Sequence, residues 1–189
     1  MEKIEIELKF PLKETLELVE RLKGIAKFIS EERQIDSYLT PFHRNFIEHS
    51  PIYEWLRIRE YHRDGKVLFN LNYKNFGSDK KDDTISCKES ETDIEDVVAL
   101  KNILKSLDFK EIIVVDKKRI NFSYKDCIIS IDSVAELGEY IEIEVEGEFG
   151  SLDEAKKHLF EVLREIDADV GDQLFFGYPQ ILMKKKGMM

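Results

Sequence analysis

Cysteine and histidine, the residues that build most zinc and redox sites, are scarce in this chain of 189 residues. Its two cysteines, Cys87 and Cys127, form no Cys-x-x-Cys pair, so the sequence indicates neither a zinc site nor dithiol redox chemistry. Both cysteines fall in predicted strands, where we expect buried free thiols in a reducing compartment. The four histidines also lack the mutual spacing of metal ligands.

Long apolar runs and an excess of positive charge are missing as well. No apolar segment approaches the roughly 18 residues of a membrane-spanning helix, and the N-terminus is charged from Glu2 onward, unlike a signal peptide. The net charge of -10 and the pI near 5.0 argue against a general nucleic-acid binder. We therefore expect a cytoplasmic protein with neither a nucleic-acid nor a membrane partner. Oligomer formation stays open.

What the chain does contain is typical of a globular domain, with 42% hydrophobic and 36% charged residues. Because no linker or low-complexity stretch divides it, we expect one domain over residues 1–189. Asp64-Gly65 is a strong hairpin signal, and Lys125-Asp126 is a weaker one. Alternating apolar and polar residues predict strands over residues 3–10, 33–39, 53–62, 66–74, 84–91, 112–116, 117–124, 126–133 and 139–146.

Three segments with helical spacing of apolar residues interrupt these strands, at 12–23, 93–107 and 152–166. Thr92 with Glu95, and Ser151 with Glu154, match the capping box of a helix start, and Gly24 is expected just after the first helix. Many antiparallel strands with a few amphipathic helices predict an α+β fold. We expect an antiparallel closed β-barrel with the helices packed outside.

Charged residues recur on one face of most predicted strands. In the first strand Glu5, Glu7 and Lys9 alternate with apolar residues, and Glu142 and Glu144 do the same in the last. The middle strands carry bases with the same parity: Arg57, Arg59, Lys74, Lys117 and Arg119. For one strand a solvated outer face is the simpler interpretation, but the repetition across strands indicates a sheet that encloses something charged.

Closure of the sheet would bring the glutamates of the first and last strands together. Clustered carboxylates repel one another unless a cation joins them, and hard divalent cations such as Mg²⁺ or Mn²⁺ prefer oxygen ligands. The guanidinium and ammonium groups of the middle strands match phosphate oxygens. Together the two walls predict a site for a polyphosphate and a metal ion.

The same residues resemble a known family over nearly the whole chain. The ordered series is similar to the CYTH superfamily of triphosphate tunnel metalloenzymes, and it most resembles the class IV adenylate cyclase-like branch. The motifs that carry the resemblance are Glu5-x-Glu7-x-Lys9, Gln34-x-Asp36-x-Tyr38, Arg44-Asn45-Phe46, Glu54 to Arg59, Leu71 to Lys74, Lys117-x-Arg119, Asp132 to Glu144 and Tyr178 with Ile181 and Leu182.

The resemblance implies a role for each matching residue. Metal ligands would be Glu5, Glu7, Glu142 and Glu144, and the metal would be Mg²⁺ or Mn²⁺. The phosphates would contact Lys9, Arg57, Arg59, Lys74, Lys117 and Arg119. Glu5, Glu7, Lys9 and Arg59 are expected to act in the reaction itself. Further candidate tunnel residues are Glu89, Glu91 and Asp132. Lys88 has the opposite parity to Glu89 and Glu91, so a bulge would be needed to place Lys88 and the two glutamates inside the tunnel together.

Three functions remain open at this point. The first is an adenylate cyclase-like enzyme that converts ATP to cyclic AMP and pyrophosphate. The second is a triphosphatase acting on tripolyphosphate, thiamine triphosphate or a nucleotide. The third, of another class, is a non-catalytic module that binds nucleotides or polyphosphate. We also expect Arg57 and Arg59 to project into a wet cavity, so that removing either would affect binding more than folding.

Overall fold

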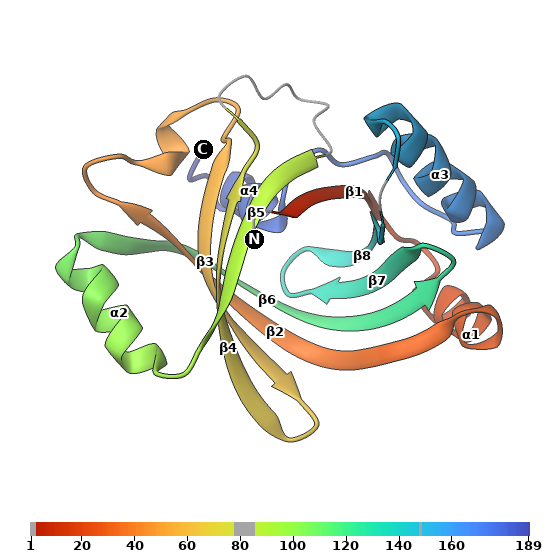
Figure 1. The fold of residues 1–189 in the computed structure, drawn as a ribbon, viewed down its shortest axis with the longest axis horizontal. Helices are drawn as coiled ribbons and strands as arrows, with labels where there is room; N and C mark the ends of the chain where they lie inside the picture. The colour runs from red at the N-terminus through yellow and green to blue at the C-terminus, as the bar shows by residue number, and fades with distance from the viewer. Residues whose placement is uncertain (1–2, 78–85, 148) are drawn as a thin grey trace.

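Closure of the first strand on the last defines the architecture. Within the residues that the computed structural model describes, 3–77, 86–147 and 149–189, eight antiparallel strands form one closed barrel. The order around the barrel is β1-β5-β4-β3-β2-β6-β7-β8, so β1 pairs with β8 as predicted (Figure 1). The strands are β1 (Lys3–Pro11), β2 (Lys27–Pro41), β3 (Glu54–Arg63), β4 (Lys66–Asn75), β5 (Ser86–Ile94), β6 (Phe109–Tyr124), β7 (Cys127–Val134) and β8 (Gly138–Val145).

Helices pack around this barrel and confirm the predicted α+β fold. α1 and α3 lie on one side, and α2 lies on the opposite side (Figure 1). The helices are α1 (Thr15–Ile25), α2 (Val97–Ser106), α3 (Leu152–Glu165) and α4 (Tyr178–Lys185), with a short 3-10 helix at Phe46–Glu48. No described helix is both long and apolar enough to cross a membrane.

The main apolar core lies outside the barrel, between its wall and α1 and α3. Leu8 and Phe10 of β1 are 1% and 4% exposed, and the Phe10 ring packs edge-on against Phe160 of α3. Because side chains alternate along a strand, Glu7 and Lys9 then point into the barrel. The predicted division into an apolar outer face and a charged inner face therefore holds for this strand.

A second apolar cluster closes one end of the barrel. Leu182 and Met183 of α4 are 1% and 0% exposed, and they belong to a cluster with Val115 of β6 and Val134 of β7. The periodicity of the sequence did not predict α4, which is only 8 residues long. Its Pro179 sits at a helix start, where a missing N–H costs nothing.

Some strand boundaries differ from the prediction. The segments 112–116 and 117–124 form one strand, β6, because no turn residue separates Asp116 from Lys117. β2 begins at Lys27 rather than at residue 33. β5 is described from Ser86 to Ile94, and residues 84 and 85 of the predicted strand lie outside the described residues.

Two helix starts were also predicted wrongly. Thr92 lies in β5, and α2 is capped instead by Asp96, whose side chain accepts a hydrogen bond from the Ala99 amide at 2.9 Å. α1 begins at Thr15 rather than at residue 12, and Gly24 lies inside it.

The cap predicted at Ser151 is confirmed, because its hydroxyl accepts from the Glu154 amide at 3.2 Å. Both hairpins are confirmed too, with positive φ at Asp64, Gly65 and Lys125. Positive φ at two successive residues is the geometry of a type I′ hairpin turn.

Candidate active site

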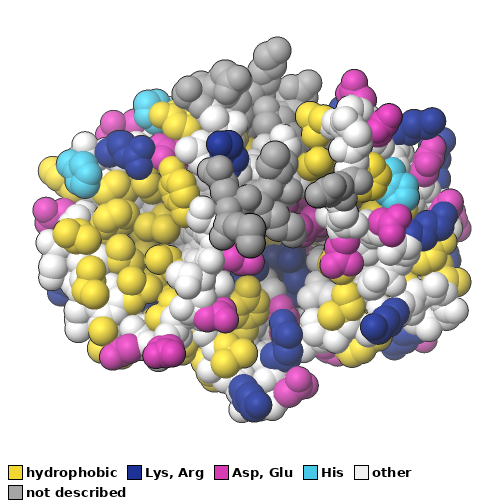
Figure 2. Space-filling view, viewed as in Figure 1, with side chains coloured by type: hydrophobic (Ala, Val, Ile, Leu, Met, Phe, Trp, Pro, Cys, Tyr) yellow, Lys and Arg dark blue, Asp and Glu magenta, His cyan; other side chains and the backbone are white. Residues whose placement is uncertain are grey.

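The barrel interior encloses a cavity of about 250 Å³ with charged walls. Acidic and basic side chains are visible in the hollow near the centre of the face in Figure 2. All but one of the predicted site residues line the cavity, namely Glu5, Glu7, Lys9, Arg57, Arg59, Lys74, Glu89, Glu91, Lys117, Arg119, Glu142 and Glu144. The exception is Asp132, which is fully buried inside the barrel beneath Lys117, Arg119 and Tyr178.

In β5 the two glutamates, and not Lys88, face the barrel interior. The pairing of β4 with β5 runs without a shift from Asn75 opposite Lys88 to Phe69 opposite Ile94. Without a bulge, Glu89 and Glu91 face the cavity and Lys88 is exposed on the outer face. Cys87 shares the inner parity, and its thiol donates to Glu5 at 3.2 Å. Both cysteines are free and buried, as expected.

The first and last strands place their charges directly opposite each other. Glu7 faces Glu144 and Lys9 faces Glu142 in the register of β1 and β8. The Lys9 ammonium lies 2.9 Å from Glu142 but 3.4 Å from Glu7. Burial, together with the nearby carboxylates of Glu142 and Glu5, raises the pKa of Glu7 above its ordinary value despite Lys9. Glu7 is thus a cavity carboxylate whose negative charge is poorly compensated.

Lys74 of β4 links the glutamates of β1 and β5. Its ammonium forms an ion pair with Glu5 and lies 3.6 Å from Glu89, which also accepts from Asn72 at 2.5 Å. Burial alone would raise the pKa of Glu5, but Lys74 outweighs it and lowers the pKa to about 2. Glu5 is therefore a carboxylate already matched by a base.

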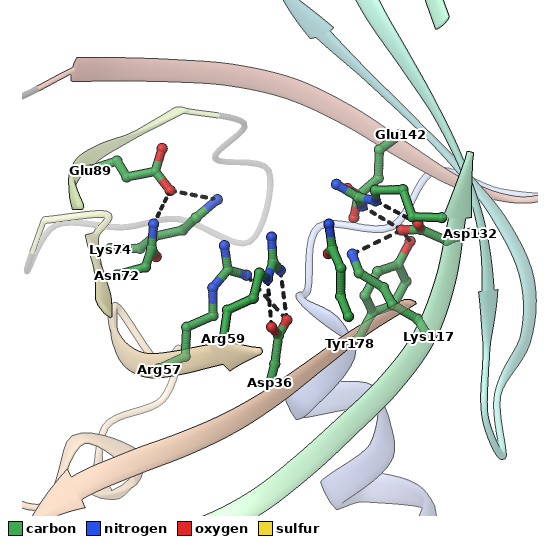
Figure 3. A network of polar contacts seen from close by, with 12 residues as sticks. Asp36, Arg57, Arg59, Asn72, Lys74, Glu89, Lys117, Asp132, Glu142 and Tyr178 are labelled. Carbon is green, nitrogen blue, oxygen red and sulfur yellow. Dashed lines mark hydrogen bonds and ion pairs between the residues drawn. The ribbon is translucent and has the colours of Figure 1, made fainter. Parts of the chain in front are cut away.

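Two arginines and an aspartate lie between these groups (Figure 3). Arg59 donates twice to Asp36 of β2, at 2.5 and 2.6 Å, and Arg57 lies 3.5 Å from the same carboxylate. Although Asp36 is 1% exposed and burial opposes its charge, Arg59 and Arg57 hold the pKa of Asp36 well below its ordinary value. No role was predicted for Asp36, although its parity with Tyr38 in the second strand was visible in the sequence.

This arrangement corrects the expectation of a wet setting for both arginines. The side chain of Arg59 is only 6% exposed and is paired bidentately with a buried acid. Arg57 is more accessible, at 14%, and its Nε is buried without a hydrogen-bond partner. Of the two, Arg57 has the donor capacity left for a ligand, whereas Arg59 also has a structural role.

Asp132 does not line the cavity but holds the two bases of β6, Lys117 and Arg119. It accepts from Arg119 at 2.6 Å and from Lys117 at 3.1 Å, and Arg119 also contacts Glu142. Burial, followed by the positive charge of Arg119, lowers the pKa of Lys117 to about 7 despite Asp132. An anionic ligand in the cavity would favour the protonated form of Lys117.

The cyclase-like segment between Arg44 and Arg59 divides into two parts. Only its inward residues, with Arg57 and Arg59 among them, line the cavity. Arg44 donates instead to Glu54 at 2.9 Å, and Glu54 is 2% exposed and also accepts from Tyr73. These contacts anchor the 3-10 helix against the outer face of β3 and β4.

A divalent cation fits the carboxylate wall on the chemistry of its donors. Among the described residues, no group of three His, Cys, Asp or Glu side chains converges as a ready-made metal site. Mg²⁺ sites commonly use one or two carboxylates and complete their shell with substrate phosphates. Glu7 and Glu144, which face each other across β1 and β8, supply such a pair, and the raised pKa of Glu7 marks a charge that a cation would stabilise.

Sequence reasoning missed the segment that forms one wall of the cavity, residues 174–179 before and at the start of α4. The segment is fixed to β1, because the Leu174 amide donates to the Lys9 carbonyl at 2.8 Å. It brings Phe175, Phe176 and Tyr178 to the cavity. Only the resemblance of Tyr178 to a family motif had pointed to this region.

Comparison with known proteins identifies the family. A sequence model of the CYTH domain matches residues 3–174. This chain belongs to the CYTH domain family. The family implies a site for a triphosphate and a divalent metal, and the predicted resemblance is confirmed.

Relatives of this CYTH protein share its length as well as its fold. The protein MJ0240 of Methanocaldococcus jannaschii, provisionally named an adenylate cyclase, is 33% identical over 87% of this chain and 90% of its own. The structure of PH1819 from Pyrococcus horikoshii has a TM-score of 0.83 at 29% identity, covering 96% of this chain and 99% of that one. HpAC1 from Hippeastrum, described as having a dominant triphosphatase activity, shares the fold with a TM-score of 0.64 at 18% identity, covering 99% of this chain and 96% of its own.

Proposed function

We propose that this CYTH protein is a Mg²⁺- or Mn²⁺-dependent enzyme that converts ATP to cyclic AMP and pyrophosphate. The observation that carries the proposal is the cavity itself, in which a basic wall faces the glutamates of β1 and β8. The basic side chains that line it are Lys9, Arg57, Arg59, Lys74, Lys117 and Arg119. A triphosphate supplies the dense negative charge and the many acceptor oxygens that so many cationic donors require.

Binding would exchange partners within the cavity. In this structure Lys9 pairs with Glu142, and Lys74 pairs with Glu5. A bound triphosphate would give both ammonium groups new anionic partners. Glu142 and Glu5 would then lose the positive charges that balance them. Those carboxylates then need a cation, so we expect the triphosphate and the metal to bind cooperatively.

In the proposed reaction the ribose 3′-hydroxyl attacks the α-phosphorus, its proton is lost, and the bond to the β-phosphate breaks to release pyrophosphate. Mg²⁺ or Mn²⁺, when bound, would lower the pKa of that hydroxyl and stabilise the charge that develops on phosphate oxygens. Glu7 and Glu144 would hold the metal, with Glu5 and Glu142 beside them. Arg57, with its unpartnered Nε, would contact the β- and γ-phosphates and stabilise the leaving group.

A nucleotide is favoured over an inorganic polyphosphate by the aromatic residues of the cavity. Phe76, Phe175 and Phe176 line it and are only half-buried. Partly exposed aromatic side chains beside a phosphate-binding wall are the kind of surface on which a nucleobase stacks. The adenylate cyclase name of MJ0240 supports the same choice.

The second candidate is a triphosphatase, in which water attacks the terminal phosphorus. The charged side chains of the tunnel favour it, because they would bind phosphates whatever organic group is attached. The triphosphatase activity described for HpAC1, which shares the fold, supports it as well. A non-catalytic binding module is a weaker candidate, because such a module has no use for the glutamates that line the cavity.

Product analysis separates these functions. The purified protein is incubated with Mn²⁺ or Mg²⁺ and, in turn, ATP, GTP, tripolyphosphate and thiamine triphosphate, and the products are resolved by ion-exchange chromatography. We expect cyclic AMP and pyrophosphate in equal amounts from ATP, and neither product in excess EDTA. Orthophosphate without cyclic nucleotide would assign the triphosphatase, and binding without turnover would assign the module.

A further inference from the structure

Tyr178, the first residue of α4, occupies a position between two lysines of the tunnel. Its side chain is buried, at 4% exposed, and its ring lies 4.5 Å from the Lys9 ammonium and 5.0 Å from that of Lys117. Its hydroxyl donates to Asp132 at 2.8 Å. Figure 3 shows Tyr178 beside Lys117 and Asp132 on the side of the tunnel opposite Lys74. One side chain thus contacts bases from β1 and β6 and an acid from β7.

These contacts bear on the position of both lysines. The face of an aromatic ring attracts a cation, and the attraction is stronger where water is excluded. Lys117 needs such support, because burial and the neighbouring Arg119 disfavour its charged form. The hydroxyl of Tyr178 adds a further donor to Asp132, the carboxylate that holds Lys117 and Arg119.

The ring is itself held firmly. It packs edge-on against Tyr140 of β8 at 5.1 Å, and the following turn of α4 buries Leu182 and Met183 in the end of the barrel. Packing of these apolar residues fixes the start of α4 against the tunnel. The position of Tyr178 is thus set by the barrel end, and the positions of the lysines are set in part by Tyr178.

We propose that Tyr178 is a positioning residue that holds Lys9 and Lys117 aimed at the triphosphate, so that α4 is part of the binding site. The proposal rests on the proposed function, since it takes a triphosphate as the ligand. Tyr178 touches no reacting atom in this role. It acts through the two lysines, and its loss should weaken binding of any triphosphate, with or without an organic group.

Calorimetric titration with inorganic tripolyphosphate in the presence of Mn²⁺ tests this role without requiring turnover. Tyr178→Leu removes the ring face and the hydroxyl, and Tyr178→Phe removes the hydroxyl alone. Leu182→Ala is the matched control, because it loosens the same helix without touching a lysine. We expect the dissociation constant to rise about tenfold or more in Tyr178→Leu and about threefold in Tyr178→Phe, with less than a twofold change in Leu182→Ala.

A double-mutant cycle adds a readout that loss of packing alone would not move. In a Lys117→Met background, Tyr178→Leu should weaken binding by clearly less than it does in the wild type, because one of its two cations has gone. Equal effects in both backgrounds, or a Leu182→Ala effect as large as that of Tyr178→Leu, would make Tyr178 merely structural. If Tyr178→Leu does not fold, unchanged binding by Tyr178→Phe overturns the proposal. Failure of the wild type to bind tripolyphosphate would overturn the proposed function as well.

Discussion

Replacing Glu7 with glutamine is expected to lower turnover of the best triphosphate about a hundredfold or more. The substitution keeps the shape of the side chain and removes one anionic oxygen from the proposed metal site opposite Glu144. Steady-state turnover at saturating Mn²⁺ measures the effect. Glu31→Gln, on the exposed outer face of β2, is the matched control and should leave turnover unchanged.

The same variant has a second expected property, which distinguishes a ligand from a structural residue. The pKa of Glu7 is raised in the folded state, so the fold binds that proton more tightly than the unfolded chain does. Ionisation of Glu7 therefore costs stability, and the cost grows as the pH rises from the unfolded pKa through the raised folded pKa. Glu7→Gln removes it, so the melting temperature without metal should be equal to or higher than that of the wild type. Loss of turnover together with a melting temperature below that of the wild type would make Glu7 a structural residue.

Replacing Arg59 with methionine is expected to reduce the free energy of unfolding by about 3 kcal/mol. The loss follows from the bidentate pair with Asp36, because a carboxylate that is 1% exposed would be left with only Arg57, at 3.5 Å. Breaking a buried ion pair from one side costs far more than breaking an exposed one. Denaturant unfolding without ligand measures the effect.

Arg57→Met is the matched control for this prediction. The two arginines lie on the same strand and face the same cavity, but Arg57 makes only the longer contact with Asp36. We expect its free energy of unfolding to change by about 1 kcal/mol or less, while its affinity for tripolyphosphate falls as much as that of Arg59→Met. Equal unfolding midpoints for the two variants would contradict the structural role of Arg59.

Alternation along the strands made the inner face of the barrel predictable. A side-chain period of two places Glu5, Glu7 and Lys9 on one face whatever the tertiary structure, and closure of β1 on β8 then brings them to Glu142 and Glu144. The charges on that face predicted a polyphosphate and a divalent metal, and the family resemblance added a role for each matching residue.

Contacts between side chains distant in the sequence could not be predicted in the same way. Asp36 and Asp132 look like any other strand acids until the register places each beside two bases. Tyr178 reaches the tunnel only because α4 is short and docks on the end of the barrel, and nothing in its local sequence indicates that docking. α2 began later than predicted because β5 extends through Thr92, where pairing with β4 overrides a helix-start pattern.

The central claim is that the tunnel holds a triphosphate and a divalent cation together, and thermal unfolding tests it most directly. Four samples are compared: the protein alone, with Mn²⁺, with tripolyphosphate in excess EDTA, and with Mn²⁺ and tripolyphosphate together. The ion pairs of Lys9 and Lys74 with glutamates predict a rise in melting temperature of about 5–10 °C for the last sample, well above the sum of the two separate rises. An equal rise with tripolyphosphate in EDTA would contradict it.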